Sequence, residues 1–170
     1  MSKRDRSYNK GTHMINQDRI TDDVLDNVPV ICVLKDAYGA FVYWNEALNR
    51  AFELPADGMR GKTEYHFMPD DDAAAIRNND RRVLDTGEVL SAIEFTKFAD
   101  GTRAAWLVKK FRVVVNEQKF LGVIGCRVAN YPADASTSEN ILAPHLELCT
   151  SRLAEVAKSI RPRDYLPPEL

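Results

Sequence analysis

Residues 30–45 read VICVLKDAYGAFVYWN, and this stretch decides the fold. Two apolar, largely β-branched or aromatic runs, 30–34 and 41–44, have the composition of short strands. The segment between them contains Asp-Ala-Tyr-Gly, a tight-turn sequence in which Gly39 supplies the positive φ angle. We therefore expect a β-hairpin, followed by a helix for which Asn45 is a natural N-cap.

Downstream of the hairpin, helical and extended patterns alternate. A long helix is expected to begin at Asp70, because three consecutive aspartates favour the positive end of the helix dipole, and to end at Gly87. Three strands joined by polar turns are expected after it: residues 90–98, 103–115 and 120–128. Runs of strands on either side of helices predict an α+β fold with one antiparallel sheet.

Composition narrows the class of protein. The 170 residues are 45% hydrophobic and 28% charged, with a net charge of −2, which suits one domain with tails and argues against direct nucleic-acid binding. We find no apolar run of the ~18 residues that a membrane span needs and no secretory signal, so we expect a cytoplasmic protein. The three scattered cysteines are expected to be buried hydrophobes. Since no catalytic or metal-binding motif is recognisable, we expect neither an enzyme nor a metal site.

The chain divides into four segments. Residues 1–20 are expected to be a disordered or tag-like tail, because Gly-Thr-His-Met at 11–14 resembles a cloning remnant. Residues 21–129 form the expected domain, which starts with a short helix capped by Thr21. Residues 130–143 have the composition of a linker, and residues 144–161 that of a C-terminal helix.

The C-terminal helix carries an apolar seam with alternating steps of three and four residues. Two interpretations remain open: a short parallel coiled coil in a homodimer, or docking of the helix onto its own domain. The seam residues are Leu146, Cys149, Leu153, Val156 and Ile160.

Several spaced motifs, taken in order, resemble the PAS domains of bacterial ligand-sensing signalling proteins. They lie at residues 33–47 (with Lys35, Asp36, Gly39, Phe41 and Asn45), 61–71, 80–87, 94, 100–101 and 122–125. The resemblance implies a five-stranded antiparallel sheet of order 2-1-5-4-3, with helices on one face and a cavity beneath them. It also implies a domain that binds a small molecule or dimerises and passes the change to an effector.

Departures from known subtypes argue against two cofactors. Flavin-binding light sensors of this family carry a reactive cysteine at the position that resembles Glu64 here. Oxygen-sensing haem members place an axial histidine about eight residues after a Met-Pro step, a position that is Ile76 here. We therefore expect neither flavin nor haem, and leave the small molecule unidentified.

If the family's pocket-facing register holds, alternate strand residues point into the cavity. Buried charges there would be paired with one another, or solvated on the outer face, or would bind a carboxylate-bearing or otherwise polar metabolite through Arg127 and Lys110. The candidate ligand-binding residues are Val33, Lys35, Tyr43, His66, Phe67, Glu94, Thr96, Trp106, Val108, Lys110 and Arg127.

The expected function is that of a non-catalytic sensory module. It would bind a small polar molecule, or mediate homodimerisation, and signal to an effector or signalling partner. The alternative is the sensor portion of a two-component histidine kinase, or of a transcription regulator, whose effector domain lies outside this chain.

Overall fold

The computed structural model describes residues 20–52, 58–98, 100–131 and 135–161, so the expected tail falls almost entirely outside the described residues. The strands are β1 (Ile31–Lys35), β2 (Phe41–Trp44), β3 (Leu90–Lys97), β4 (Arg103–Val115) and β5 (Gln118–Val128). The α-helices are α1 (Asp23–Asp26), α2 (Glu46–Phe52), α3 (Asp70–Thr86), α4 (Ala135–Leu142) and α5 (Leu146–Ser159). Two 3-10 turns complete the set: η1 (Glu64–His66) and η2 (Ala143–His145).

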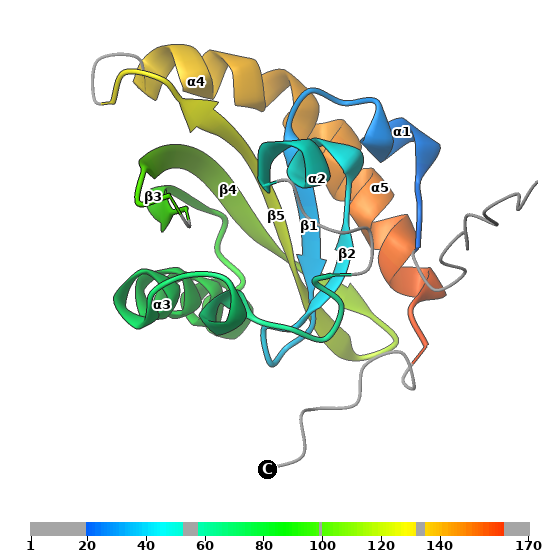
Figure 1. Ribbon diagram of the computed structural model, residues 1–170. Helices are drawn as coiled ribbons and strands as arrows, with labels where there is room; N and C mark the ends of the chain where they lie inside the picture. Colours follow the sequence, from blue (N-terminus) through cyan, green and yellow to red (C-terminus); the bar gives the residue numbers. More distant parts are fainter. Residues whose placement is uncertain (1–19, 53–57, 99, 132–134, 162–170) are drawn as a thin grey trace, which may run out of the picture.

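The strands form one antiparallel sheet of order β2-β1-β5-β4-β3 (Figure 1), which confirms the predicted order. The β4–β5 hairpin is tighter than predicted. Asn116 and Glu117 both adopt positive φ, 49° and 66°, so two residues make the turn and β5 begins at Gln118 instead of residue 120. The long hairpin supplies the centre of the sheet.

Asn45 fixes the end of the first hairpin. Its Oδ1 accepts hydrogen bonds from the backbone N–H of Cys32 at 2.9 Å and of Leu48 at 3.3 Å, so the predicted N-cap is confirmed. Its Nδ2 donates to the carbonyls of Leu25 and Val30, at 2.8 and 2.9 Å. One buried amide therefore joins the entry to β1, the hairpin and α2.

The predicted long helix is confirmed. α3 spans Asp70–Thr86, and Gly87 follows it as the C-cap, with a φ of 76° in the left-handed region that glycine favours. The first short helix differs in its cap: Asp22, not Thr21, accepts from the backbone N–H groups of the first turn. Asp22 also pairs with Arg152 of α5, a long-range contact that the local sequence does not reveal.

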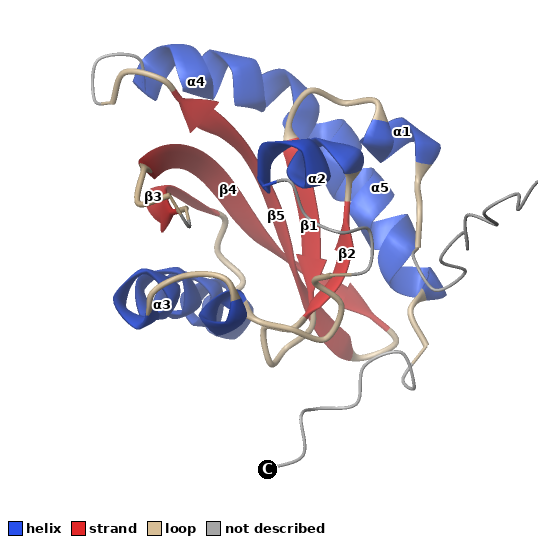
Figure 2. Cartoon of the chain, viewed as in Figure 1, coloured by secondary structure: helices blue, strands red, loops and turns tan. Residues whose placement is uncertain are grey.

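Helices cover both faces of the sheet, whereas the resemblance implied helices on one (Figure 2). The inner face packs with α2 and α3, in an inner core cluster that includes Val33, Leu48 and Val83. The outer face carries α5, in an outer core cluster that includes Leu34 and Leu153. Successive residues of a strand point to opposite faces, so β1 contributes to both clusters.

The C-terminal segment differs from its expected division. Helix α4 occupies residues predicted to be a linker. Two of its own residues, Ser138 and Leu142, are buried. Helix α5 lies on the sheet of its own chain. Four seam residues, Cys149, Leu153, Val156 and Ile160, belong to the outer core cluster, and Leu146 packs against it.

Docking is therefore the interpretation of the seam that the structure supports, since a docked α5 does not offer these residues to a second copy. The coiled coil stays a prediction for an undocked state. In the described part of the chain, no helix combines the length and the apolar composition needed to cross a membrane.

Candidate functional site

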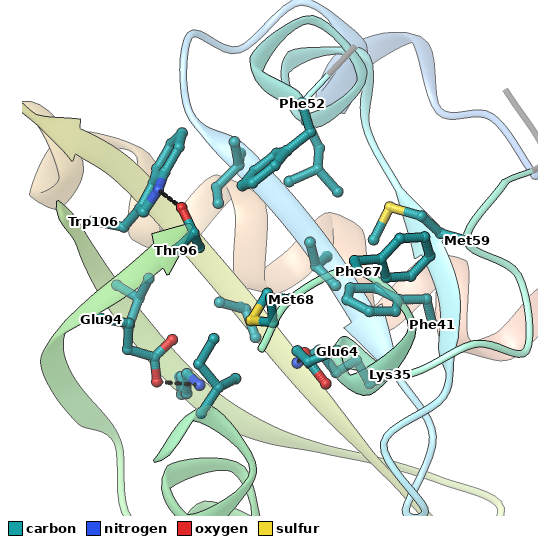
Figure 3. A pocket seen from close by; sticks show the side chains of 17 residues that line it. Lys35, Phe41, Phe52, Met59, Glu64, Phe67, Met68, Glu94, Thr96 and Trp106 are labelled. Carbon is teal, nitrogen blue, oxygen red and sulfur yellow. Dashed lines mark hydrogen bonds and ion pairs between the residues drawn. The ribbon is translucent and has the colours of Figure 1, made fainter. Parts of the chain in front are cut away.

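A cavity of about 110 Å³ lies between the inner face of the sheet and the segments that cover it (Figure 3). Strands β1 to β5 each contribute side chains, and α2, α3, η1 and the segments beside η1 contribute the rest. The lining residues are Ile31, Val33, Lys35, Phe41, Leu48, Phe52, Met59, Glu64, Phe67, Met68, Ile76, Glu94, Thr96, Trp106, Val108, Lys110 and Val123.

The structure brings most of the predicted binding residues to this cavity. For the residues on strands, alternation predicts the correct side of the sheet, because every second residue of a strand points to the same face. The predicted residues that line the cavity are Val33, Lys35, Phe67, Glu94, Thr96, Trp106, Val108 and Lys110.

Tyr43 does not line the cavity, because it lies opposite Leu34, whose side chain packs on the other face of the sheet, and a bulge in the β1–β2 pairing brings Phe41 to the cavity instead. Lys35 is opposite Phe41 and Leu34 is opposite Tyr43, so Val42 is an extra residue on β2. Phe41 consequently faces the cavity, whereas Tyr43 belongs to the outer core cluster. The strand prediction was right and the side of this one residue was wrong.

His66 and Arg127 also lie outside the cavity lining. His66 is exposed, and its ring Nδ1 accepts from the backbone N–H of Thr63 at 3.2 Å, so it caps η1. Arg127 is paired in register with Trp106 on the inner face but is exposed near the end of β5, where it borders a separate hollow. The structure therefore places Arg127 outside the cavity lining, and an anion-binding role of Arg127 stays a prediction.

Sequence reasoning missed nine of the lining residues. Ile31 and Val123 follow the same alternation as the residues found, and that signal could have identified them. Met59, Glu64, Met68 and Ile76 come from loops and helices, for which alternation says nothing. Phe41, Leu48 and Phe52 complete the missed set.

Five buried charged residues form a continuous network at one side of the cavity. Asp80 of α3 joins two lysines: its Oδ2 lies 2.8 Å from Lys35 Nζ and its Oδ1 lies 2.5 Å from Lys110 Nζ. Lys110 also contacts Glu94 Oε1 at 2.6 Å, and Lys35 pairs with Glu64 Oε1. The outcome is the paired alternative predicted for buried charges, except that Arg127 takes no part.

Two further residues extend the network. Arg77 Nη1 lies 3.4 Å from Asp80 Oδ2, and its Nη2 donates to the carbonyl of Tyr38 at 2.8 Å. Asn79 Nδ2 donates to Glu94 Oε1 at 2.9 Å. With Arg77 included, three cations face three carboxylates, so the formal charges of the network sum to zero.

Electrostatics keep the centre of the network ionised. Burial raises the pKa of Asp80, but the charges and hydrogen bonds of Lys35 and Lys110 outweigh it and lower that pKa below its usual 3.8. Burial lowers the pKa of Lys35, but Asp80 and Glu64 outweigh it and raise that pKa. Asp80 and Lys35 are therefore both charged at neutral pH.

Glu64 has one oxygen that the network does not use. Its Oε1 pairs with Lys35, whereas its Oε2 is buried and finds no hydrogen-bond partner among the described residues. The side chain is 3% exposed and lines the cavity. A buried carboxylate oxygen without a donor is costly, so this atom is the unsatisfied polar position of the site.

Aromatic and thioether side chains form the remaining walls. Phe52 stacks on Trp106 with ring centroids 5.3 Å apart, and Phe41 meets Phe67 edge-on at 6.3 Å. Trp106 Nε1 donates to Thr96 Oγ1 at 3.0 Å, which satisfies the indole N–H (Figure 3). The walls thus present apolar surface to any occupant.

The cysteines lie away from the cavity. Cys32 and Cys149 lie 3.5 Å apart between β1 and α5, in the outer core cluster and not in the cavity, and all three cysteines are buried as predicted. Across the described ranges, no group of three or more His, Cys, Asp or Glu side chains is placed to hold a metal ion.

Comparison with known proteins agrees with this architecture. A family model described as PAS fold matches residues 25–126. A search of the curated proteins finds no match.

Among solved structures, the chain resembles the VqmA dimer of Vibrio cholerae, with 23% identity and a TM-score of 0.55 over 62% of this chain and 49% of that one. It resembles the LOV protein of Rhodobacter sphaeroides, with 18% identity and a TM-score of 0.60 over 82% and 80% of the two chains. A PAS domain from Colwellia psychrerythraea matches with 14% identity and a TM-score of 0.53, over 62% and 91%. This chain therefore spans about half of the VqmA chain, and these likenesses show the shared fold.

Proposed function

The chain belongs to the PAS fold family, and from this premise we propose that it is a non-catalytic sensory module that binds a small molecule in the inner cavity. Occupancy of the cavity would alter the ion network and the sheet, and an effector would respond. The observation that carries the proposal is the cavity itself, which combines apolar walls with a buried set of paired charges.

The size of the cavity limits the ligand. A cavity of about 150 Å³ with apolar walls is sufficient for benzene, and drug-sized ligands occupy about 300–1,000 Å³. At about 110 Å³, this cavity is smaller than that benzene site, so it limits the ligand to a molecule no larger than about one small ring. The proposal therefore involves neither flavin nor haem, and the side chains of Glu64 and Ile76 that line the cavity offer neither a thiol nor an imidazole.

The polarity of the ligand is the next inference. Lys110 already contacts two carboxylates, and the exposed Arg127 lies outside the cavity lining. An anionic ligand would consequently meet no free cation among the described lining residues. This favours a molecule with polar groups but without a carboxylate.

Strand β1 offers a route from the cavity to the C-terminal helix. Val33 and Lys35 face the cavity, whereas Cys32 and Leu34 of the same strand pack in the cluster that contains α5. A shift of β1 on ligand binding would change the surface against which Leu153 and Cys149 rest. We propose that the stability of α5 docking is the property that the ligand controls.

The alternative that the comparisons favour is the sensor portion of a transcription regulator. VqmA is described as a LuxR-type receptor with a target DNA, and as a dimer, and one of its structures is bound to DPO. The same use of the fold here would need an effector outside the described residues. Homodimerisation would then involve α5 after undocking, or another surface.

Native mass spectrometry of the full chain, purified from cells of its own source, tests the proposal. We expect a fraction of the protein to carry an additional small-molecule mass that is lost on unfolding. A protein with no additional mass, and with no affinity for ring-sized probes such as toluene, would contradict it.

A further inference from the structure

We propose that the ligand is electrically neutral and donates an N–H or O–H hydrogen bond to Glu64 Oε2. This inference rests on the proposed function, because it assigns the chemical class of the molecule that occupies the cavity. Three observations lead to it. Glu64 Oε2 is an acceptor without a donor in the described part of the chain, the charges of the ion network sum to zero, and the aromatic cavity walls offer mainly apolar contacts to a ring.

Glu64 Oε2, to which no described residue donates, determines that the ligand should be a hydrogen-bond donor. Glu64 is held by η1 and by its ion pair with Lys35, so Oε2 has a fixed position at the cavity while Oε1 is occupied. Oε2 is buried and has no donor among the described residues. A ligand that donates would replace the hydrogen bond that burial removed, whereas a ligand that only accepts would leave the oxygen unsatisfied.

The charge balance sets the net charge. Lys35, Lys110 and Arg77 offset Glu64, Asp80 and Glu94, so the network is neutral before any ligand binds. A cation would add an uncompensated buried charge, and an anion would in addition lie against Glu64. A neutral donor avoids both desolvation costs.

The walls set the shape. Phe41 and Phe67 line the cavity together with Glu64, and Phe52 and Trp106 stack at another part of the lining (Figure 3). Aromatic walls favour a flat ring, which can make edge or stacking contacts with them. The inferred class is therefore a single-ring molecule that bears a hydroxyl, amide or ring N–H group.

Phenol and toluene provide a matched pair of probes, because they have the same shape and differ in one donor. The quantity to measure is the ratio of their dissociation constants, by calorimetry or ligand-observed NMR on the full chain. In Glu64→Gln, Lys35 retains an oxygen partner and the amide NH₂ replaces Oε2. We expect the preference for phenol over toluene to fall by about tenfold or more in this variant.

Glu88→Gln is the matched control, because Glu88 is exposed and forms only a surface pair with Arg82 among the described residues. We expect the phenol-to-toluene ratio of this variant to equal that of the wild type. An unchanged ratio in Glu64→Gln, with toluene still bound, would overturn the Glu64 inference and leave the proposed function standing. Failure of the wild type to bind either probe would overturn both.

Two measurements on the wild type cover the case in which Glu64→Gln does not fold. The hydroxyl proton of bound phenol should appear downfield and exchange slowly with water, and its absence from a saturated complex would contradict the hydrogen bond. N-methylpyridinium has the shape of toluene with a positive charge. It should bind more weakly than phenol, and tighter binding of this cation would overturn the neutral assignment.

Discussion

Asp80 Oδ1 lies 2.5 Å from Lys110 Nζ, and both side chains are at most 1% exposed. The second oxygen of Asp80 contacts Lys35, so one carboxylate compensates two buried cations. This arrangement makes Asp80 the central residue of the network. Removal of its charge would leave lysines buried beside a neutral group.

The variant Asp80→Asn should lower the free energy of unfolding by about 3–5 kcal/mol, because three cations would then face only two carboxylates in the network. Urea unfolding followed by circular dichroism measures the change. Asp85→Asn is the matched control: Asp85 is exposed on the same helix, and its substitution should change stability by less than about 0.5 kcal/mol. Equal stabilities of the two variants would contradict the central role of Asp80.

The free energy of unfolding should also depend on pH. The folded pKa of Asp80 is lower than its unfolded value of 3.8, so its contribution is complete above that value and is lost as pH falls from 3.8 through the folded pKa. We expect the wild type to lose stability more steeply than Asp80→Asn in this window. Parallel pH profiles of the two proteins, from urea unfolding at each pH, would contradict the assignment.

Docking of α5 can be tested with two leucines of the same helix. Leu153 is fully buried and Leu148 is 44% exposed. Leu153→Ala should cost about 2–5 kcal/mol through the cavity it leaves, and Leu148→Ala well under 1 kcal/mol. Loss of a dimer in sedimentation of Leu153→Ala, with the free energy of unfolding of the monomer unchanged, would instead support the coiled coil, because Leu153 belongs to its seam.

The buried thiols give a chemical test of the same interface. The hydrogen bond with Cys149 and burial both raise the pKa of Cys32, so its thiolate is scarce in the folded protein. We expect iodoacetamide to modify Cys32 at the rate of unfolding rather than at the rate of a free thiol. Rapid modification of the native protein, mapped by peptide mass spectrometry, would show that α5 does not cover β1.

The position of Arg127 leads to a further prediction. Because Arg127 is exposed and lies outside the cavity lining, Arg127→Ala should leave the dissociation constant of phenol within about twofold of the wild-type value. Calorimetric titration of the full chain measures it. A tenfold loss of affinity would return Arg127 to the binding site.

The sheet and its inner face could be predicted because strands carry local signals. Alternation places Val33, Glu94 and Lys110 on one face from sequence alone. Alternation fails between Phe41 and Tyr43, which are two residues apart in β2 but face opposite sides of the sheet, because the extra residue Val42 depends on how two strands pair and not on either strand alone. Alternation also gives no sign that Arg127, although it is on the predicted face, is exposed and lies outside the cavity lining.

The centre of the network was harder to predict, since Asp80 and Glu64 are supplied by α3 and η1. One signal was available: Ala73, Ile76, Asp80 and Val83 follow helical steps of three and four, so Asp80 falls on the buried stripe of α3. A carboxylate in an apolar stripe indicates a buried ionic partner. No comparable periodicity marks Glu64 in its three-residue turn.

Two indole signals offer the most direct test of ligand binding in the cavity. Trp106 lines the cavity and donates to Thr96, whereas Trp44 donates to Asn49 at 2.8 Å and lies outside the lining. The measurement is a titration of the ¹⁵N-labelled full chain with phenol, in which the two indole N–H resonances are followed by NMR. We expect a saturable shift of the Trp106 resonance with Trp44 almost unchanged. No shift at Trp106 at saturating phenol, or equal shifts of both resonances, would contradict binding in the cavity.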